Sequence, residues 1–230
     1  MPVNFFAKRI IKRFEEQLQN PTIKTRKATY EEIVTDKIAS YRNVLIENLS
    51  GKSLEEERVQ QEALWLLENA AHREVVKFSL IILGLTDCEK YKDRIFMIGL
   101  HDEFTPYAIF ALKNGTANGN DSIFQLAKGL TGWGRVEAIR QLDASSKEIK
   151  DWLLTEGLED TDLDDALAYL CAEKGELDIA LEEDEITGNL YDGAGKIIVG
   201  LLKDSSDIDS YPYAGRVLSR FVHHAKRHCL

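Results

Sequence analysis

The stretch "KGLTGWGRVEAIRQLD", residues 128–143, contains a spacing that recurs along the chain. Its Gly-Leu pair begins at Gly129, a small residue follows nine positions later at Ala138, and Leu142 comes four positions after that. The spacing recurs in three further segments: "GLHDEFTPYAIFALK" from Gly99, "GLEDTDLDDALAYLC" from Gly157 and "EITGNLYDGAGKIIV" from Glu185. The small residues lie 30, 28 and 28 positions apart, and Ser79 continues the register 29 positions before the first of them. Five units with so constant a period are typical of a helical repeat array.

Each unit is expected to form two short helices, with the glycine near the end of the first and the small residue in the second. Apolar residues lie at the small position, one later and four later, so they form one stripe of the second helix. Ala138, Ile139 and Leu142 show this arrangement, and the small residue allows neighbouring helices to approach closely. The expected first helices are Lys90–Leu100, Asp121–Leu130, Ser146–Leu154 and Glu176–Glu183.

The segments "VVKFSLIILGL", "TPYAIFAL" and "RVEAIRQL" resemble HEAT-like repeats, in particular the short-period members related to phycobilin-lyase repeats. The resemblance covers residues 73–203. It departs from the family at the usual Asp-Pro corner and at the Val-Arg opening of the second helix, which are mostly absent; only Arg135-Val136, in reversed order, comes near. The segments "GWGR" and "WLLTEG" are also similar to uncharacterised bacterial proteins, and that resemblance implies no activity.

The resemblance and the periodicity together predict an all-α fold, a right-handed α-α superhelix (solenoid) of HEAT-like helical hairpins. We expect a single domain over residues 1–230, in which five repeats occupy residues 73–203. Residues 1–72 would form an N-terminal helical cap, and residues 204–230 a C-terminal capping helix.

Three helices are expected in the N-terminal cap, over residues 3–20, Thr29–Leu49 and Ser53–Ala70. Residues 3–20 are amphipathic, and Pro21 ends the helix. Its apolar face carries Phe6, Ile10, Phe14 and Leu18, and a basic cluster lies beside that face: Lys8, Arg9, Lys12 and Arg13. We favour a helix packed on the first repeat, because an open array must cover its ends. The alternative is a helix that makes peripheral contact with a membrane or a partner.

The net charge of −10 is unevenly distributed. Residues 1–30 carry +5 and residues 216–230 carry +4, so the remainder must carry −19. A body this acidic repels a phosphate backbone, which argues against a nucleic-acid partner. The basic ends are expected either to dock on the acidic body or to be attracted to an acidic surface elsewhere.

The three cysteines are odd in number and widely spaced, which favours a reducing, cytoplasmic location over a disulfide framework. The longest apolar run, Val75–Leu85, is interrupted by Lys77 and is too short to span a bilayer. The N-terminal residues show no apolar region or cleavage site of a secretory signal.

Few residues have the spacing of a catalytic or metal site. His223, His224 and His228 precede Cys229, but this cluster lies at the chain end, where a solvated basic helix is the simpler interpretation. The segment 101–103, His-Asp-Glu, is interpreted as a polar turn between helices rather than an acid–base pair. No nucleotide-binding or nucleophile-elbow motif is present. We therefore expect no cofactor, no metal and no catalytic residue.

What remains is a binding surface, because second helices line the concave face of HEAT-like arrays. Positions beside the small residue should point away from the core. The expected partner-binding residues are Tyr107, Phe110, Trp133, Arg135, Arg140, Asp165, Tyr169, Tyr191 and Lys196. Aromatic residues mixed with charge suit a protein or peptide partner, and the acidic body favours a basic one. Alternatively, Phe110 and Tyr169 pack between adjacent units.

The sequence therefore predicts a non-enzymatic interaction module. The alternative, implied by the repeat resemblance, is a lyase-like or chaperone-like enzyme that cradles a small pigment-like ligand. A deep apolar groove with convergent arginines would favour the enzyme, and a shallow polar groove would favour the module.

Overall fold

The computed structural model describes residues 3–52, 55–158, 164–203 and 205–228. It is all-α and 76% helical, and these residues contain no β-strand. The chain divides into two compact units, residues 1–126 and residues 127–230, and each is described by itself.

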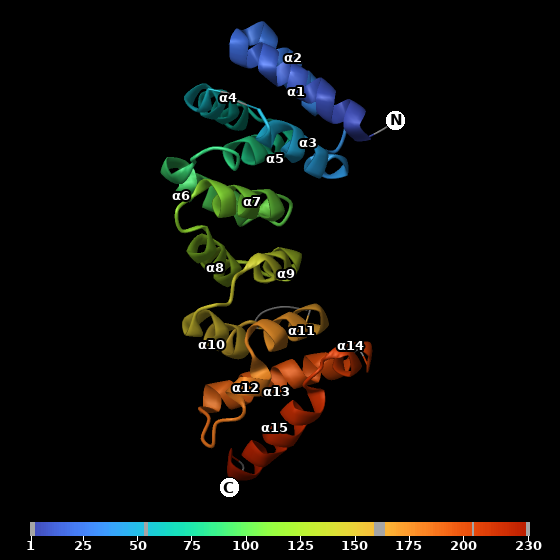
Figure 1. Ribbon diagram of the computed structural model, residues 1–230, viewed down its shortest axis with the longest axis vertical. Coiled ribbons are helices and arrows are strands. Elements are labelled where there is room, and N and C mark those ends of the chain that lie inside the picture. The colour runs from blue at the N-terminus through green and yellow to red at the C-terminus, as the bar shows by residue number, and fades with distance from the viewer. Residues whose placement is uncertain (1–2, 53–54, 159–163, 204, 229–230) are drawn as a thin grey trace. The chain divides into compact units, whose positions relative to one another are not determined.

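The first unit begins with a helical hairpin and continues as short helices in chain order, from α1 to α7 (Figure 1). Its α-helices are α1 (Val3–Gln19), α2 (Ile23–Ile33), α3 (Arg42–Ser50), α4 (Glu56–Glu68), α5 (Arg73–Leu83), α6 (Lys92–Gly99) and α7 (Thr105–Gly115). Two 3₁₀ turns accompany them, η1 (Ile38–Ser40) and η2 (Glu89–Tyr91). Helix α8 (Gly119–Gly129) crosses the division between the units.

The second unit continues with the remaining helices and ends in a long basic helix (Figure 1). Its helices are α9 (Gly132–Gln141), α10 (Lys147–Thr155), α11 (Asp164–Lys174), α12 (Leu177–Ala180), α13 (Gly188–Lys203), α14 (Ser205–Ser210) and α15 (Ala214–His228).

The helices pack in sequential pairs, as the sequence period predicts. Within a pair, α4 contacts α5, α6 contacts α7 and α10 contacts α11. Second helices also contact the next second helix along the chain: α5 with α7, α9 with α11 and α11 with α13. Each unit is therefore a repeat-like array in which elements contact mainly their neighbours.

The small position of the repeat lies in the core at four of its five occurrences, and the remaining one, Ala166, is only half-buried. The side chains of Ser79, Ala108, Ala138 and Ala194 are all completely buried. In the α6–α7 pair, a Cβ atom added to Gly99 would lie 2.8 Å from the Cβ atom of Ala108. The two residues that the spacing relates therefore touch across the corner, and the glycine leaves room for the alanine.

The prediction of one helix over Thr29–Leu49 is wrong, because α2 ends at Ile33 and α3 begins at Arg42. The Thr35 hydroxyl donates to the Glu32 carbonyl oxygen at 2.7 Å. The Ile38 backbone N–H donates to the carboxylate of Glu74, 36 positions later in the chain, also at 2.7 Å. These bonds satisfy the backbone of the turn and stabilise the break between the helices.

Two other predicted helices are shorter than expected. The helix expected over Ser53–Ala70 spans Glu56–Glu68, and Ser53 itself lies outside the described residues. The helix expected over Glu176–Glu183 is reduced to the four residues of α12. Glu176 has a positive φ of 54°, so the backbone turns sharply just before α12.

The apolar face of α1 packs inside the first unit. Phe14 is buried, with its ring 5.3 Å from that of Phe78 on α5. The Gln17 amide donates to the buried carboxylate of Glu62 on α4 at 2.8 Å. Arg9 pairs with Glu32 at 2.9 Å. Helix α1 thus packs on the α4–α5 hairpin, and part of its basic cluster docks on α2.

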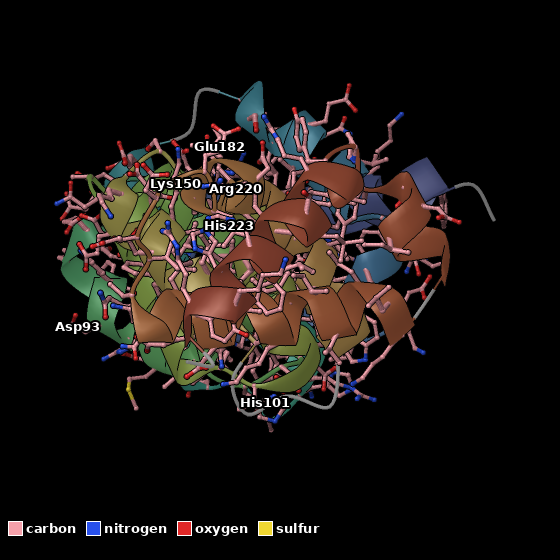
Figure 2. The ribbon with its side chains drawn as sticks, turned by 90° about the horizontal axis from the view of Figure 1, so that it is seen from below. Asp93, His101, Lys150, Glu182, Arg220 and His223 are labelled. Carbon is pink, nitrogen blue, oxygen red and sulfur yellow. The ribbon has the colours of Figure 1, made fainter. Side chains whose placement is uncertain are left out.

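The basic C-terminal helix docks on an acidic corner in the same way. Arg220 donates to the carbonyl oxygens of Leu181 and Glu182 at 2.9 and 2.6 Å, and Figure 2 shows Arg220 and Glu182 on the same edge of the second unit. The buried His224 ring lies 3.0 Å from the Leu181 carbonyl oxygen. These carbonyl groups follow the short α12. In a longer helix they would accept hydrogen bonds from backbone N–H groups, and here the Arg220 guanidinium donates instead.

Candidate functional site

Two predicted partner-binding residues, Tyr107 and Arg135, are buried. Tyr107 is 6% exposed, and the Arg42 guanidinium lies 5.1 Å from its ring centroid. Arg135 is 5% exposed; it donates to the Glu156 carbonyl oxygen at 2.7 Å and lies 5.1 Å over the Trp152 ring. Both side chains pack between elements of their own unit, so they present almost no surface to a partner.

Three further predicted residues are half-buried against neighbouring elements. A Cβ atom added to Gly84, at the end of α5, would lie 2.8 Å from the Phe110 ring. Tyr169 makes an edge-on contact with Tyr211 at 6.1 Å, and Tyr191 stacks on Phe221 of α15 at 4.9 Å. These contacts agree with the alternative interpretation, in which Phe110 and Tyr169 pack against neighbouring elements of their own unit.

Trp133, Arg140 and Lys196 are exposed on the second unit, and Trp133 has 64% of its surface accessible. Trp133 and Arg140 lie seven residues apart on α9 and therefore share a helix face. Between them Glu137 pairs with Arg140 at 2.9 Å. The side chain of Asp165, the remaining predicted residue, lies outside the described residues.

A groove that the sequence does not predict lies in the first unit. Its volume is about 770 Å³, within the range of about 300–1,000 Å³ that is usual for ligand pockets. Its apolar floor comes from four different helices and the turn after α5: Phe14, Leu49, Val59, Ile82 and Leu85. All of these but Leu85 are buried. We call this feature the α1–α7 groove, because its lining runs from α1 to the loop after α7.

The rim of the α1–α7 groove is acidic and is held by backbone hydrogen bonds. One carboxylate oxygen of Glu56 accepts the Asp87 N–H at 2.6 Å. Glu89 accepts the Ala117 N–H at 2.8 Å, which ties the loop after α5 to the loop after α7. Each carboxylate has two oxygens, so the second oxygen of Glu56 can still face a ligand, whereas that of Glu89 pairs with Lys92 at 3.7 Å.

A second, shallower compartment continues from the groove. It is lined by Glu56, Glu57, Gln60, Asp87, Glu89 and Lys90, and it shares three of these residues with the groove. Four carboxylates and one ammonium group make its net charge −3. The Gln60 amide donates to the Asp87 carbonyl oxygen at 2.7 Å and fixes the loop from below. We call these residues the acidic end of the groove.

A separate cluster of charges surrounds Lys77, and its geometry indicates a structural role. Its ammonium group lies 2.8 Å from carboxylate oxygens of both Glu74 and Glu103. Burial acts to lower the pKa of Lys77, but hydrogen bonds from its ammonium group to these two carboxylates raise it above its usual value. Arg73 also pairs with Glu103, at 3.3 Å. Every charge in the cluster faces an opposite one, which suits the joining of α5 to the α6–α7 corner.

The corner residues His101, Asp102 and Glu103 form a polar turn, as predicted. The His101 ring accepts the Glu103 backbone N–H at 3.3 Å, and the Glu103 carboxylate is engaged by Lys77 and Arg73. No side chain caps the start of α7. The Thr105 hydroxyl instead donates to the Gly99 carbonyl oxygen at 2.8 Å.

The two described cysteines, Cys88 and Cys171, are buried, and burial raises the pKa of each thiol to about 12. Thiols of this kind remain protonated and are weak nucleophiles and metal ligands. No three His, Cys, Asp or Glu side chains within the described ranges gather closely enough to hold a metal ion. The side chain of His228 and all of Cys229 lie outside those ranges, so metal binding by the C-terminal cluster stays a prediction.

Comparison of the chain with protein-family models, with curated proteins and with solved structures finds no match. The structure therefore shows sequentially paired helices, and no match assigns them to a family. The HEAT-like resemblance stays an interpretation of the sequence repeat. In the part of the chain that the structure describes, no helix has the length and apolarity needed to cross a bilayer.

Proposed function

We propose that the protein is a non-enzymatic interaction module that binds an extended segment of a partner protein in the α1–α7 groove. The single observation that carries this proposal is an apolar floor beside a fixed acidic rim. An apolar surface recessed among polar residues is typical of protein- and ligand-binding sites. In this proposal the two units are parts of one right-handed HEAT-like superhelix in the cytoplasm, and the acidic rim selects a basic partner.

The apolar floor meets one criterion for a pigment-binding enzyme, but the described lining lacks the convergent arginines that such an enzyme would also need, and this favours a module. The described residues of this lining include one cation, Lys52, and no arginine. Lys52 is already paired with Glu15 at 2.5 Å. A pigment with carboxylate side chains would need convergent cations, whereas this rim would repel it. The buried thiols are likewise unsuited to forming a covalent bond with a ligand.

Exposed predicted residues of the second unit provide a further candidate contact. Trp133 and Arg140 present an aromatic ring and a guanidinium on one face of α9, and these two residue types are enriched in interface hot spots. Lys196, on α13, is also exposed. In the proposed function these side chains form a second candidate contact surface, which belongs to the second unit by itself.

The proposal is tested by selection of peptides from an unbiased displayed library on the immobilised full-length protein. Enriched peptides are expected to lose at least about tenfold in affinity for Ala117→Trp, whose indole would occupy the groove. The matched control is Ala39→Trp, because Ala39 is exposed in the same unit and does not line the groove. Failure to enrich any peptide, or equal binding to both variants, would refute the proposal.

A further inference from the structure

We propose that the partner segment carries a bulky apolar side chain next to a lysine or arginine, so that the apolar group fills the floor of the groove and the cation reaches its acidic end. This inference rests on the proposed function and adds the chemistry of the ligand. It follows from two adjoining compartments of opposite character that share Glu56, Asp87 and Glu89.

The floor selects an apolar side chain. Phe14, Val59 and Ile82 contribute only carbon atoms from their side chains, and each comes from a different helix. A polar group placed on these surfaces would lose its water without gaining a hydrogen-bond partner from them. An aliphatic or aromatic side chain would instead remove apolar surface from water, chiefly its own and that of the half-buried Leu85, since the other floor residues are already buried.

The acidic end selects a cation. Glu56, Glu57, Asp87 and Glu89 line it together with Lys90, which gives the lining a net charge of −3, and Lys92, outside the lining, pairs with Glu89 at 3.7 Å. Lys90 lies over the ring of its neighbour Tyr91, with 4.9 Å between its ammonium nitrogen and the ring centroid. A guanidinium or ammonium group from a partner would therefore meet an excess of carboxylates, and an anionic group would be repelled.

The acidic end is also ordered before any ligand arrives. Glu56 is tied to the Asp87 N–H, and one oxygen of the Asp87 carboxylate accepts the Glu89 N–H at 3.1 Å. The Gln60 amide holds the Asp87 carbonyl oxygen. Carboxylates held in this way lose little conformational freedom on binding, so more of the electrostatic attraction appears as affinity.

Because the compartments share three residues, the two ligand groups must also be close together. Consecutive residues of an extended chain alternate in direction but lie only about 3.3 Å apart along the strand, and long basic side chains can reach round. An apolar residue adjacent to a basic residue is therefore the simplest pattern that fills both compartments.

The test uses fluorescein-labelled peptides GSGFRGSG and GSGRFGSG with the full-length protein, measured by fluorescence anisotropy at low and at physiological salt. At least one is expected to bind, and replacing its Phe by Gly or its Arg by Gln should weaken binding by about tenfold. Salt should weaken the Arg peptide more than its Gln counterpart. If both parent peptides bind more weakly than about 1 mM, the inference is overturned.

Protein variants locate the cation. Glu57→Gln removes one carboxylate from the acidic end and is expected to weaken the Arg peptide about fivefold while leaving its Gln counterpart unchanged. Glu47→Gln is the control, since Glu47 is exposed on α3 and lines neither compartment. Equal losses for the Arg and Gln peptides, or an equal effect of the control, would contradict the assignment.

The library selection keeps this inference separate from the proposed function. Enriched peptides that compete at the groove but lack the apolar–basic pair would overturn the ligand chemistry and leave the interaction module standing. If no peptide is enriched, the proposed function and the inference about ligand chemistry both fail.

Discussion

Lys77 is the only buried lysine among the residues that the structure describes, and its two carboxylate partners hold three segments together. Glu74 accepts the Ile38 N–H as well as the Lys77 ammonium group. Glu103 extends the cluster to the α6–α7 corner. A buried charge is tolerated only when it is paired, so the loss of either carboxylate charge should reduce stability.

The stability of this cluster is expected to depend on acid pH through Glu103. The hydrogen bond from Lys77 and the ion pair with Arg73 hold the pKa of Glu103 below its usual value of 4.5. A depressed folded-state pKa means that the unfolded chain binds the proton first. The stabilising contribution is therefore complete above pH 4.5 and is lost as the pH falls through the folded-state pKa.

Urea unfolding between pH 7 and pH 3 measures this dependence. The free energy of unfolding should fall below pH 4.5 in the wild type, and it should fall less steeply in Glu103→Gln, which has no carboxylate to titrate at this position. Glu47→Gln serves as the control, because that carboxylate is exposed and lies outside the cluster. If the free energy of unfolding fell equally steeply with pH in the wild type and in Glu103→Gln, the pairing with Lys77 would have no effect on stability at acid pH.

The α6–α7 corner shows at the level of elements why the repeat needs its glycine. A Cβ atom on Gly99 would lie 2.8 Å from the Cβ atom of Ala108 and 3.3 Å from the Leu126 side chain. Both neighbours lie in the packed interior, so neither can move away cheaply. In this pair of helices the nine-residue spacing separates two residues that meet at the corner, whereas a Cβ atom on Gly157 would instead meet the Leu153 carbonyl oxygen and the Cys171 sulfur.

Gly99→Ala is expected to lower the free energy of unfolding by about 1–3 kcal/mol, because overpacking outweighs the better helix propensity of alanine. Gly51→Ala is the matched control: nothing lies within 4 Å of its added Cβ atom, and its φ is −84°. That substitution should be neutral or slightly stabilising. Chemical denaturation of the two variants distinguishes them, and equal stability would contradict a close contact at the corner.

At the scale of the whole molecule, the helices contact mainly their neighbours in sequence. Such arrays transmit destabilisation from one repeat to the next rather than through one common core. Gly99→Ala should therefore accelerate backbone hydrogen exchange in α4–α7 and leave exchange in α10–α13 close to wild type. Mass spectrometry of peptic fragments reads both regions in one experiment. A uniform loss of protection from α1 to α15 would instead indicate a single cooperative unit.

The repeat was predictable from sequence because its signal is local. Spacings of four and nine residues report which side chains share a helix face and which residues meet at a corner, and both depend only on helix geometry. The break between α2 and α3 escaped prediction because one of its stabilising bonds comes from Glu74, far away in the chain. A helical pattern alone does not show such a partner.

The amino-acid sequence by itself determined the helical class, the sequential pairing of helices and four of the five small residues predicted for the core, since these follow from short-range periodicity. Only the tertiary structure decided which side chains remain available to a ligand. It buried Tyr107 and Arg135 through contacts with Arg42 and Trp152. It also assembled the α1–α7 groove from residues as far apart as Phe14 and Ala117, whose proximity depends on how successive helices stack.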